Sequence, residues 1–170
     1  MKIIQKAAAA QGELTPQLLK YLLKKGKPLE VKMALINELG WDFNGKSNAL
    51  LFEEYLLKKR KLKNYNELTS NVNAEELICL AYLKALDDYF QVNQALALAR
   101  RAKAKASDSY TVNIICALIE AQKALHSDQW CKVYKLTDEV RNDTSLSLDM
   151  KKEASDIIFD YMDIYKADCE

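Results

Sequence analysis

The stretches that decide the fold are Leu77-Ile78-Cys79-Leu80-Ala81-Tyr82-Leu83 and Ile114-Ile115-Cys116-Ala117-Leu118-Ile119. Each is an unbroken apolar run, which predicts a helix that is covered by neighbours on several sides. Neither glycine nor proline occurs between residues 46 and 170, whereas a sheet fold of that length would need turns built on those residues. Because helices joined by short polar turns have no such need, the sequence predicts an all-α protein.

Nine helices are expected along the chain, placed by apolar residues three and four positions apart and by capping residues. Thr15 followed by Pro16 opens the second helix, and Asn73 with Glu76 forms a capping box for the fifth. Residues 63–72 are predicted to be a polar connector between two sub-units. The expected ranges are 2–11, 15–26, 28–40, 47–61, 74–89, 92–106, 109–126, 129–141 and 147–168.

An apolar helix followed by a more polar helix occurs twice after residue 73. Ile78-Cys79 and Ile115-Cys116 lie 37 residues apart, a period typical of stacked helical repeats. The sequence therefore predicts antiparallel helix pairs stacked as an α-solenoid, within a single domain that spans 1–170. Its sub-units would be a basic four-helix part over 1–62 and a helical-repeat part over 73–168.

Residues 73–168 resemble tetratricopeptide-type helical repeats, with a period somewhat longer than that family's 34 residues. Ala95, Ala99 and Ala102 resemble the small and aromatic positions of the second helix of such a repeat. Asp128-Gln129-Trp130 resembles the turn and aromatic residue that open it. The resemblance implies a protein that presents a groove to a peptide or protein partner and performs no chemistry.

Charge is unevenly distributed along the chain. Residues 1–64 carry 13 Lys/Arg against 6 Asp/Glu, whereas residues 65–170 carry 12 against 18. The basic runs lie near the C-terminal ends of expected helices, where the negative end of the helix dipole stabilises cations. We prefer this interpretation of the runs to a phosphate-binding surface. The alternative function is a nucleic-acid-binding or regulatory protein that uses the basic N-terminal half. The candidate basic residues are Lys58, Lys59, Arg60, Lys61, Lys63, Arg100 and Arg101.

Apolar residues of the last expected helix, 147–168, form one arc that includes Ile157, Tyr161 and Ile164. Successive residues of an α-helix are rotated by about 100° around its axis. On that basis Phe159 lies nearly opposite the centre of the arc, and Met162 falls outside it. An apolar outer side predicts a contact with a partner, including a second copy of this chain; the alternative is one exposed aromatic residue or packing against the chain end. Trp41 and Phe43, in the turn after residue 40, either cap the core or join such a contact.

The chemistry-bearing residues are few. Cys79, Cys116, Cys131 and Cys169 are far apart in sequence and are expected to be free thiols of a cytoplasmic protein. His126 is the single histidine and is expected to cap a helix. No zinc-ligand spacing, phosphate loop or apolar stretch of membrane-spanning length occurs. The sequence thus predicts a non-enzymatic scaffold, without cofactor or metal, for a protein or peptide partner.

Overall fold

The computed structural model describes residues 2–40 and 47–169. The regular secondary structure of these residues is helical, apart from an isolated β-bridge between Ser109 and Ser147. The all-α prediction is confirmed, with ten α-helices where nine were expected. They are α1 (Lys2–Ala8), α2 (Pro16–Leu22), α3 (Leu29–Gly40), α4 (Asn48–Arg60), α5 (Tyr65–Asn71), α6 (Ala74–Asp87), α7 (Asn93–Lys105), α8 (Tyr110–Leu125), α9 (Trp130–Asn142) and α10 (Lys152–Met162), followed by the 3-10 helix η1 (Asp163–Cys169).

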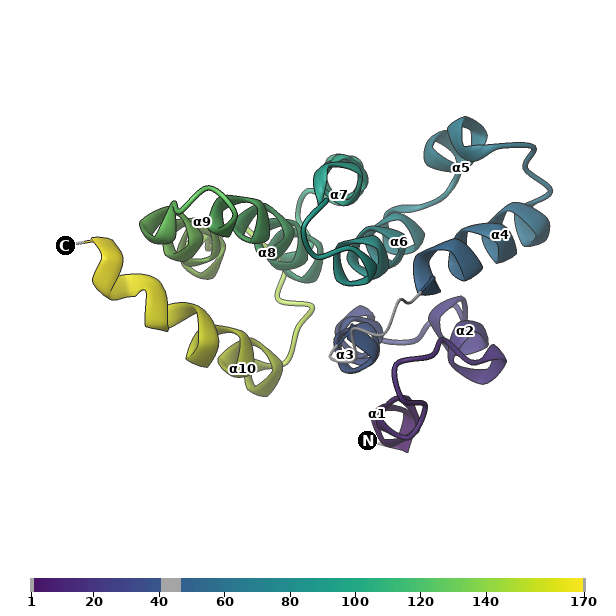
Figure 1. Cartoon of the computed structure of the whole chain (residues 1–170), viewed down its shortest axis with the longest axis horizontal. Helices are drawn as coiled ribbons and strands as arrows, with labels where there is room; N and C mark the ends of the chain where they lie inside the picture. The colour runs from purple at the N-terminus through teal and green to yellow at the C-terminus, as the bar shows by residue number, and fades with distance from the viewer. Residues whose placement is uncertain (1, 41–46, 170) are drawn as a thin grey trace.

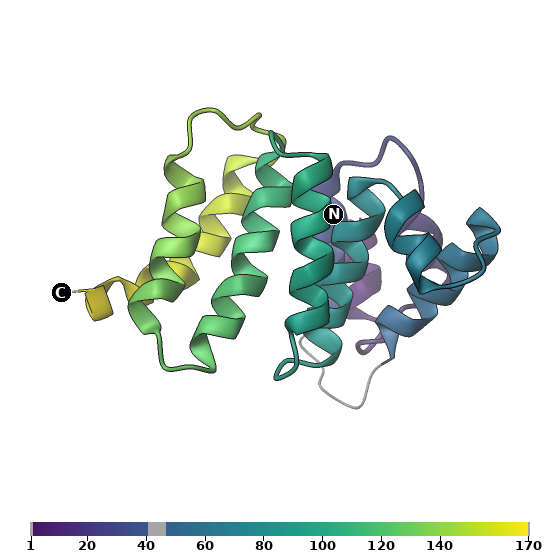
Figure 2. The same cartoon turned by 90° about the horizontal axis from the view of Figure 1, so that it is seen from above.

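Helices α6 to α9 lie side by side as antiparallel pairs (Figures 1 and 2). Helix α6 packs against α3, α4, α7 and α8, while α8 packs against α6, α7 and α9. Helices α3 and α10 lie on the same side of this row (Figure 1). All residues of Leu77–Leu83 are buried, as are those of Ile114–Ile119 except the half-buried Leu118. The two apolar helices are therefore enclosed by neighbours, as the sequence predicts.

Local caps explain where several helices begin. The Asn73–Glu76 capping box is present, with the Glu76 amide donating to Asn73 Oδ1 at 2.8 Å. The predicted connector, in contrast, contains helix α5. Asn64 Oδ1 caps this helix by accepting from the Glu67 amide at 3.0 Å, and Leu68 and Val72 are buried one turn apart. The polar composition of this segment hid the helix, because a helix this short is stabilised by packing, here of Leu68 and Val72, more than by its own sequence.

Side-chain hydrogen bonds fasten the N-terminal helices to the stack. Asn48 is buried, accepts from the Leu14 amide at 2.9 Å and donates to the Gly12 carbonyl at 2.8 Å. The carboxylate of Asp87, at the end of α6, accepts from the Ala49 amide at 2.6 Å. The start of α4 is thereby held against both the loop before α2 and the end of α6. One contiguous apolar cluster extends from α1 to α10.

The last helix begins later than expected, at Lys152 instead of residue 147. Residues preceding it are bound to the start of α8: Asp149 accepts from the Ser109 hydroxyl at 2.6 Å and from the Thr111 amide at 2.7 Å. Ser147 accepts from the Tyr110 amide at 3.2 Å, and Glu30 accepts from the Lys151 amide. Asp149, which the expected range placed inside the last helix, instead caps the start of α8.

The orientation of α10 also differs from the prediction. Phe159 and Met162 are buried, whereas Ile157, Tyr161 and Ile164 are exposed. The Arg141 guanidinium lies 4.2 Å from the centre of the Phe159 ring and pairs with Asp163 at 2.8 Å. This contact turns Phe159 toward α9. The apolar arc misled the prediction because both sides of this helix carry large apolar residues.

Two of the four cysteines are not free thiols. Cys131 and Cys169 form a disulfide, because η1 returns along the first turn of α9. Their separation of 38 residues gives no sign of this proximity in the sequence. Cys79 and Cys116 are buried free thiols, as expected.

Candidate partner-binding surface

Six rings from the α6–α7 turn, the α8–α9 turn and the α10–η1 segment gather at one end of the stack. We call them the aromatic surface. The α6–α7 turn contributes two, the end of α8 and the start of α9 contribute one each, and α10 and η1 contribute the last two. They are Tyr89, Phe90, His126, Trp130, Tyr161 and Tyr165.

Ring contacts connect the members of the aromatic surface. Phe90 stacks on His126 at 5.3 Å between centroids, and Tyr89 meets the same imidazole edge-on at 5.7 Å. Trp130 stacks on Tyr165 at 6.0 Å, and the hydroxyls of Tyr161 and Tyr165 are 3.1 Å apart. Such aromatic contacts hold rings in defined positions.

Electrostatic contacts join the two groups of rings. Burial raises the pKa of Tyr89, and the nearby Tyr161 phenol raises it further. The pKa of Tyr165 is also raised, first by burial, then by Tyr161, and to a smaller extent by Tyr89 and Asp168. The phenols of Tyr89, Tyr161 and Tyr165 therefore lie close enough to influence one another, and the raised pKa values of Tyr89 and Tyr165 keep these two protonated at neutral pH.

The stack positions these rings because alternate turns fall at the same end. The α6–α7 and α8–α9 turns lie together, opposite the α7–α8 turn (Figure 2). Gln122 on α8 donates to the carbonyls of Ala85 at 2.9 Å and Tyr89 at 2.8 Å, which fixes the first turn against the second helix pair. His126 is the C-cap residue of α8, as expected. The rings thus stand on a rigid base.

The aromatic surface is largely open to solvent. Phe90 is 76% exposed and Tyr161 is 55% exposed, and Ile157 and Ile164 extend the apolar area along α10 and η1. Contiguous exposed apolar area of this kind marks interaction sites on folded proteins.

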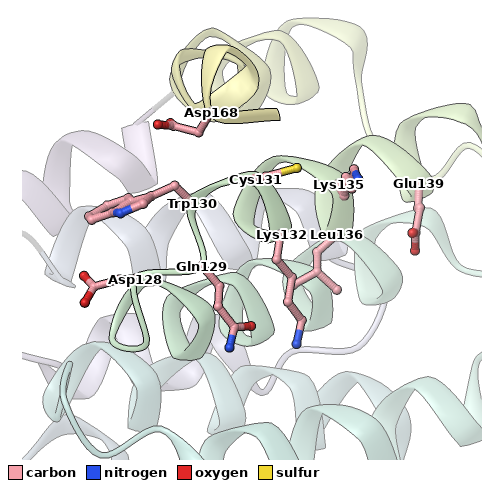
Figure 3. Close-up of a pocket in the computed structure, with 9 residues that line it drawn as sticks. All are labelled: Asp128, Gln129, Trp130, Cys131, Lys132, Lys135, Leu136, Glu139 and Asp168. Carbon is pink, nitrogen blue, oxygen red and sulfur yellow. The ribbon is translucent and has the colours of Figure 1, made fainter. Parts of the chain in front are cut away.

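A cavity of about 580 Å³ lies between α9 and η1, next to the aromatic surface. Trp130, Asp128 and Asp168 stand at one end of it, whereas Lys135 and Glu139 stand at the other (Figure 3). Cys131, whose disulfide ties η1 to α9, also lines the cavity. The covalent link therefore fixes one wall of the cavity relative to the other.

Aspartates accompany the rings. Among the residues that the structure describes, four exposed aspartates within three positions of a member of the aromatic surface form no ion pair: Asp88, Asp128, Asp160 and Asp168. This end of the stack therefore combines exposed rings with carboxylates that form no ion pair.

The residues that the sequence singled out for partner binding do not form this surface. Phe159 and Met162 are 8% and 3% exposed, so the prediction that they lie on an open outer face was wrong. Trp41 and Phe43 lie outside the described residues. Phe90 and Tyr161 were not predicted to bind a partner, although two adjacent aromatic residues at the end of an expected helix, Tyr89-Phe90, are a usable signal.

The candidate basic residues lie elsewhere, at the end of α4 and in α7. The first run ends α4 just before α5: Lys58, Lys59, Lys61 and Lys63 are exposed, and Arg60 pairs with Glu76. In the second run Arg100 pairs with Glu120, and Arg101 lies near Tyr65, whose pKa it lowers against a larger effect of burial. Arg101 therefore lies close to α5, whereas Arg100 faces α8.

No family model matches this chain, and no curated protein or solved structure gives a significant match. Within residues 2–40 and 47–169, no three His, Cys, Asp or Glu side chains are grouped so as to hold a metal ion. None of the helices described there is long and apolar enough to cross a membrane.

Proposed function

We propose that this chain is a non-enzymatic scaffold, similar to tetratricopeptide-type repeats, that binds a protein or peptide through the aromatic surface. The observation that carries the proposal is the exposure of Phe90, Trp130 and Tyr161 on a base held by ring contacts and by Gln122. Aromatic side chains dominate the energetics of protein interfaces. Rings that are already in position lose little conformational freedom on binding.

The nucleophilic side chains support a binding role. Burial raises the pKa of the Cys79 thiol to about 12 and also raises the pKa of Cys116. Both thiols are therefore protonated at neutral pH, whereas the thiolate is the reactive form. The ring of His126 is stacked on Phe90.

A cytoplasmic location remains a prediction. The Cys131–Cys169 disulfide weakens it, because such bonds persist in oxidising compartments.

Selection from a displayed library of random dodecapeptides tests the proposal. Peptides enriched on the wild-type chain should be lost on a Phe90→Ser/Tyr161→Ser variant. A Leu50→Ser/Leu51→Ser variant is the matched control, since these residues are comparably exposed on α4, away from the aromatic surface. No enrichment, or enrichment that survives in the Phe90→Ser/Tyr161→Ser variant, would contradict the proposal.

A second copy of this chain is one candidate partner for the same surface. Light scattering distinguishes this case, because a wild-type dimer should become a monomer in the Phe90→Ser/Tyr161→Ser variant. A dimer that persists in that variant uses a different face.

Nucleic-acid binding is the second candidate function, and the position of Arg101 close to α5, the helix that follows the Lys58–Lys63 run, favours it. Lys105 also reaches α5, donating to the Ser70 carbonyl at 3.2 Å. This function predicts that binding to a DNA or RNA duplex weakens steeply as salt rises. A gel shift with no binding at low salt, or binding unchanged by Lys58→Gln/Lys61→Gln/Lys63→Gln, rejects it.

A further inference from the structure

We infer that the partner segment is cationic, and that an arginine or lysine side chain of it lies on Trp130 between Asp128 and Asp168. The inference rests on the proposed function and names the chemistry of the partner. It concerns the end of the cavity where η1 faces the first turn of α9.

The indole of Trp130 is held in place yet open. Its ring stacks on Tyr165 with an angle of 15° between the planes, and the residue remains 42% exposed. In Figure 3 the Asp168 carboxylate lies above the indole and the Asp128 carboxylate lies below it. A partly exposed aromatic ring with a carboxylate on either side suits a guanidinium, which stacks on aromatic rings and donates several hydrogen bonds.

The cations of this region do not neutralise the two carboxylates. The ammonium of Lys132 points away from Trp130, and Lys135 lies at the far end of the cavity with Glu139 (Figure 3). Arg141 is paired with Asp138 and Asp163, and Lys166 lies near enough to Asp163 to lower its pKa. Asp128 and Asp168 form no ion pair in the described part of the chain.

Two further aspartates adjoin members of the aromatic surface in sequence. Asp88 adjoins Tyr89 and Phe90, and Asp160 adjoins Tyr161. An acidic partner would bring its charges against these aspartates, whereas a segment that alternates cations with apolar residues would satisfy both the carboxylates and the rings.

A separate cationic segment fits better than the basic run of a second copy. The Lys58–Lys63 run lies with α4 and α5 at one end of the molecule, and α10 and η1 lie at the other (Figure 1). A contact between these two ends would be head-to-tail and would extend from copy to copy instead of closing as a dimer.

Peptide binding tests the inference directly. The probes are two fluorescein-labelled dodecapeptides, one alternating arginine with leucine and the other alternating glutamate with leucine. Fluorescence anisotropy should detect saturable binding of the arginine peptide that weakens with rising salt. The glutamate peptide should bind at least about tenfold more weakly, because like charges across an interface are unfavourable.

Two double variants that each remove two negative charges, together with one Trp130 variant, locate the site. Asp128→Asn/Asp168→Asn should weaken the arginine peptide about fivefold or more, at the magnitude of two partly exposed ion pairs. Trp130→Leu should weaken it by about tenfold, through the lost cation–π contact. Glu13→Gln/Glu54→Gln is the matched control: it removes two negative charges from exposed residues elsewhere and should leave the affinity unchanged. Thermal melts establish that each variant is folded.

The possible failures are distinguishable. Equal binding of both peptides, or equal losses in the aspartate and glutamate double variants, would overturn the inference. Library peptides that depend on Phe90 and Tyr161 but lack basic residues would also overturn it, while leaving the proposed function in place. No peptide enrichment at all would contradict both.

Discussion

Replacing Phe159 by alanine tests how α10 is seated on the stack. Phe159 is 8% exposed, and the Arg141 guanidinium lies 4.2 Å from its ring centre. Truncating a buried phenylalanine costs about 3–5 kcal/mol, and the lost cation–π contact adds about 0.5–1 kcal/mol. Because α10 lies at the edge of the stack and its surroundings can relax, we expect a loss near 3 kcal/mol. For a chain of this size that lowers the Tm by about 6 °C or more.

Ile157→Ala is the matched control on the same helix. Ile157 is 72% exposed, so its truncation should change the free energy of unfolding by less than about 0.5 kcal/mol. Urea denaturation measures both variants, and hydrogen exchange of the α10 amides shows whether the loss is local. If Ile157→Ala were the more damaging change, the apolar arc of the sequence would face the core and the described orientation of α10 would be refuted.

Three further predictions concern the contacts that hold the C-terminal segment. Asp149→Ala should destabilise the chain by about 1–2 kcal/mol in thermal melts, because it removes the carboxylate that caps α8 at Ser109 and Thr111; no change would mean that the segment before α10 is not bound there. Reducing the Cys131–Cys169 disulfide should cost up to about 4 kcal/mol for a loop of 38 residues, and Cys131→Ser should melt at the same temperature with and without reductant. The hydrogen bond from Arg141 lowers the pKa of Asp163, so this contact contributes stability that is present above the pKa of an unfolded aspartate, about 3.9, and is lost as pH falls through the lower folded value. Hydrogen exchange of η1 should therefore rise with acidification beyond its intrinsic pH dependence, and Asp163→Asn should abolish that excess.

The helical repeat pair could be predicted because its signals are local. Each signal determines the structure of its own stretch of sequence: the apolar runs, the Asn73 cap, and the lack of glycine and proline after residue 45. These signals predict where the helices lie and which of them are enclosed by neighbours. The all-α fold is confirmed for this reason.

The C-terminal segment could not be predicted because distant contacts decide it. Asp149 and Lys151 are bound by residues 38 and 121 positions away, respectively. The α10 helix has large apolar residues on both sides, so Arg141, on another helix, decides which side is buried. The disulfide likewise joins cysteines whose spacing matches no motif.

The candidate site was hidden from sequence reasoning for a related reason. Its rings come from the α6–α7 turn, the α8–α9 turn, α10 and η1, and each ring alone has the appearance of an ordinary surface or core residue. Trp130 entered the sequence analysis only through a repeat-like turn. The geometry of the stack brings it to Tyr165 and Asp168.

Emission from Trp130 measures partner binding at the site itself. Trp41 and Trp130 are the two tryptophans of the chain, so a Trp41→Phe variant makes Trp130 the single reporter. Titration with an unlabelled form of the arginine–leucine peptide should shift or quench its emission saturably, with the affinity that anisotropy gives for the labelled peptide. Peptide binding that leaves the Trp130 emission unchanged would contradict the account.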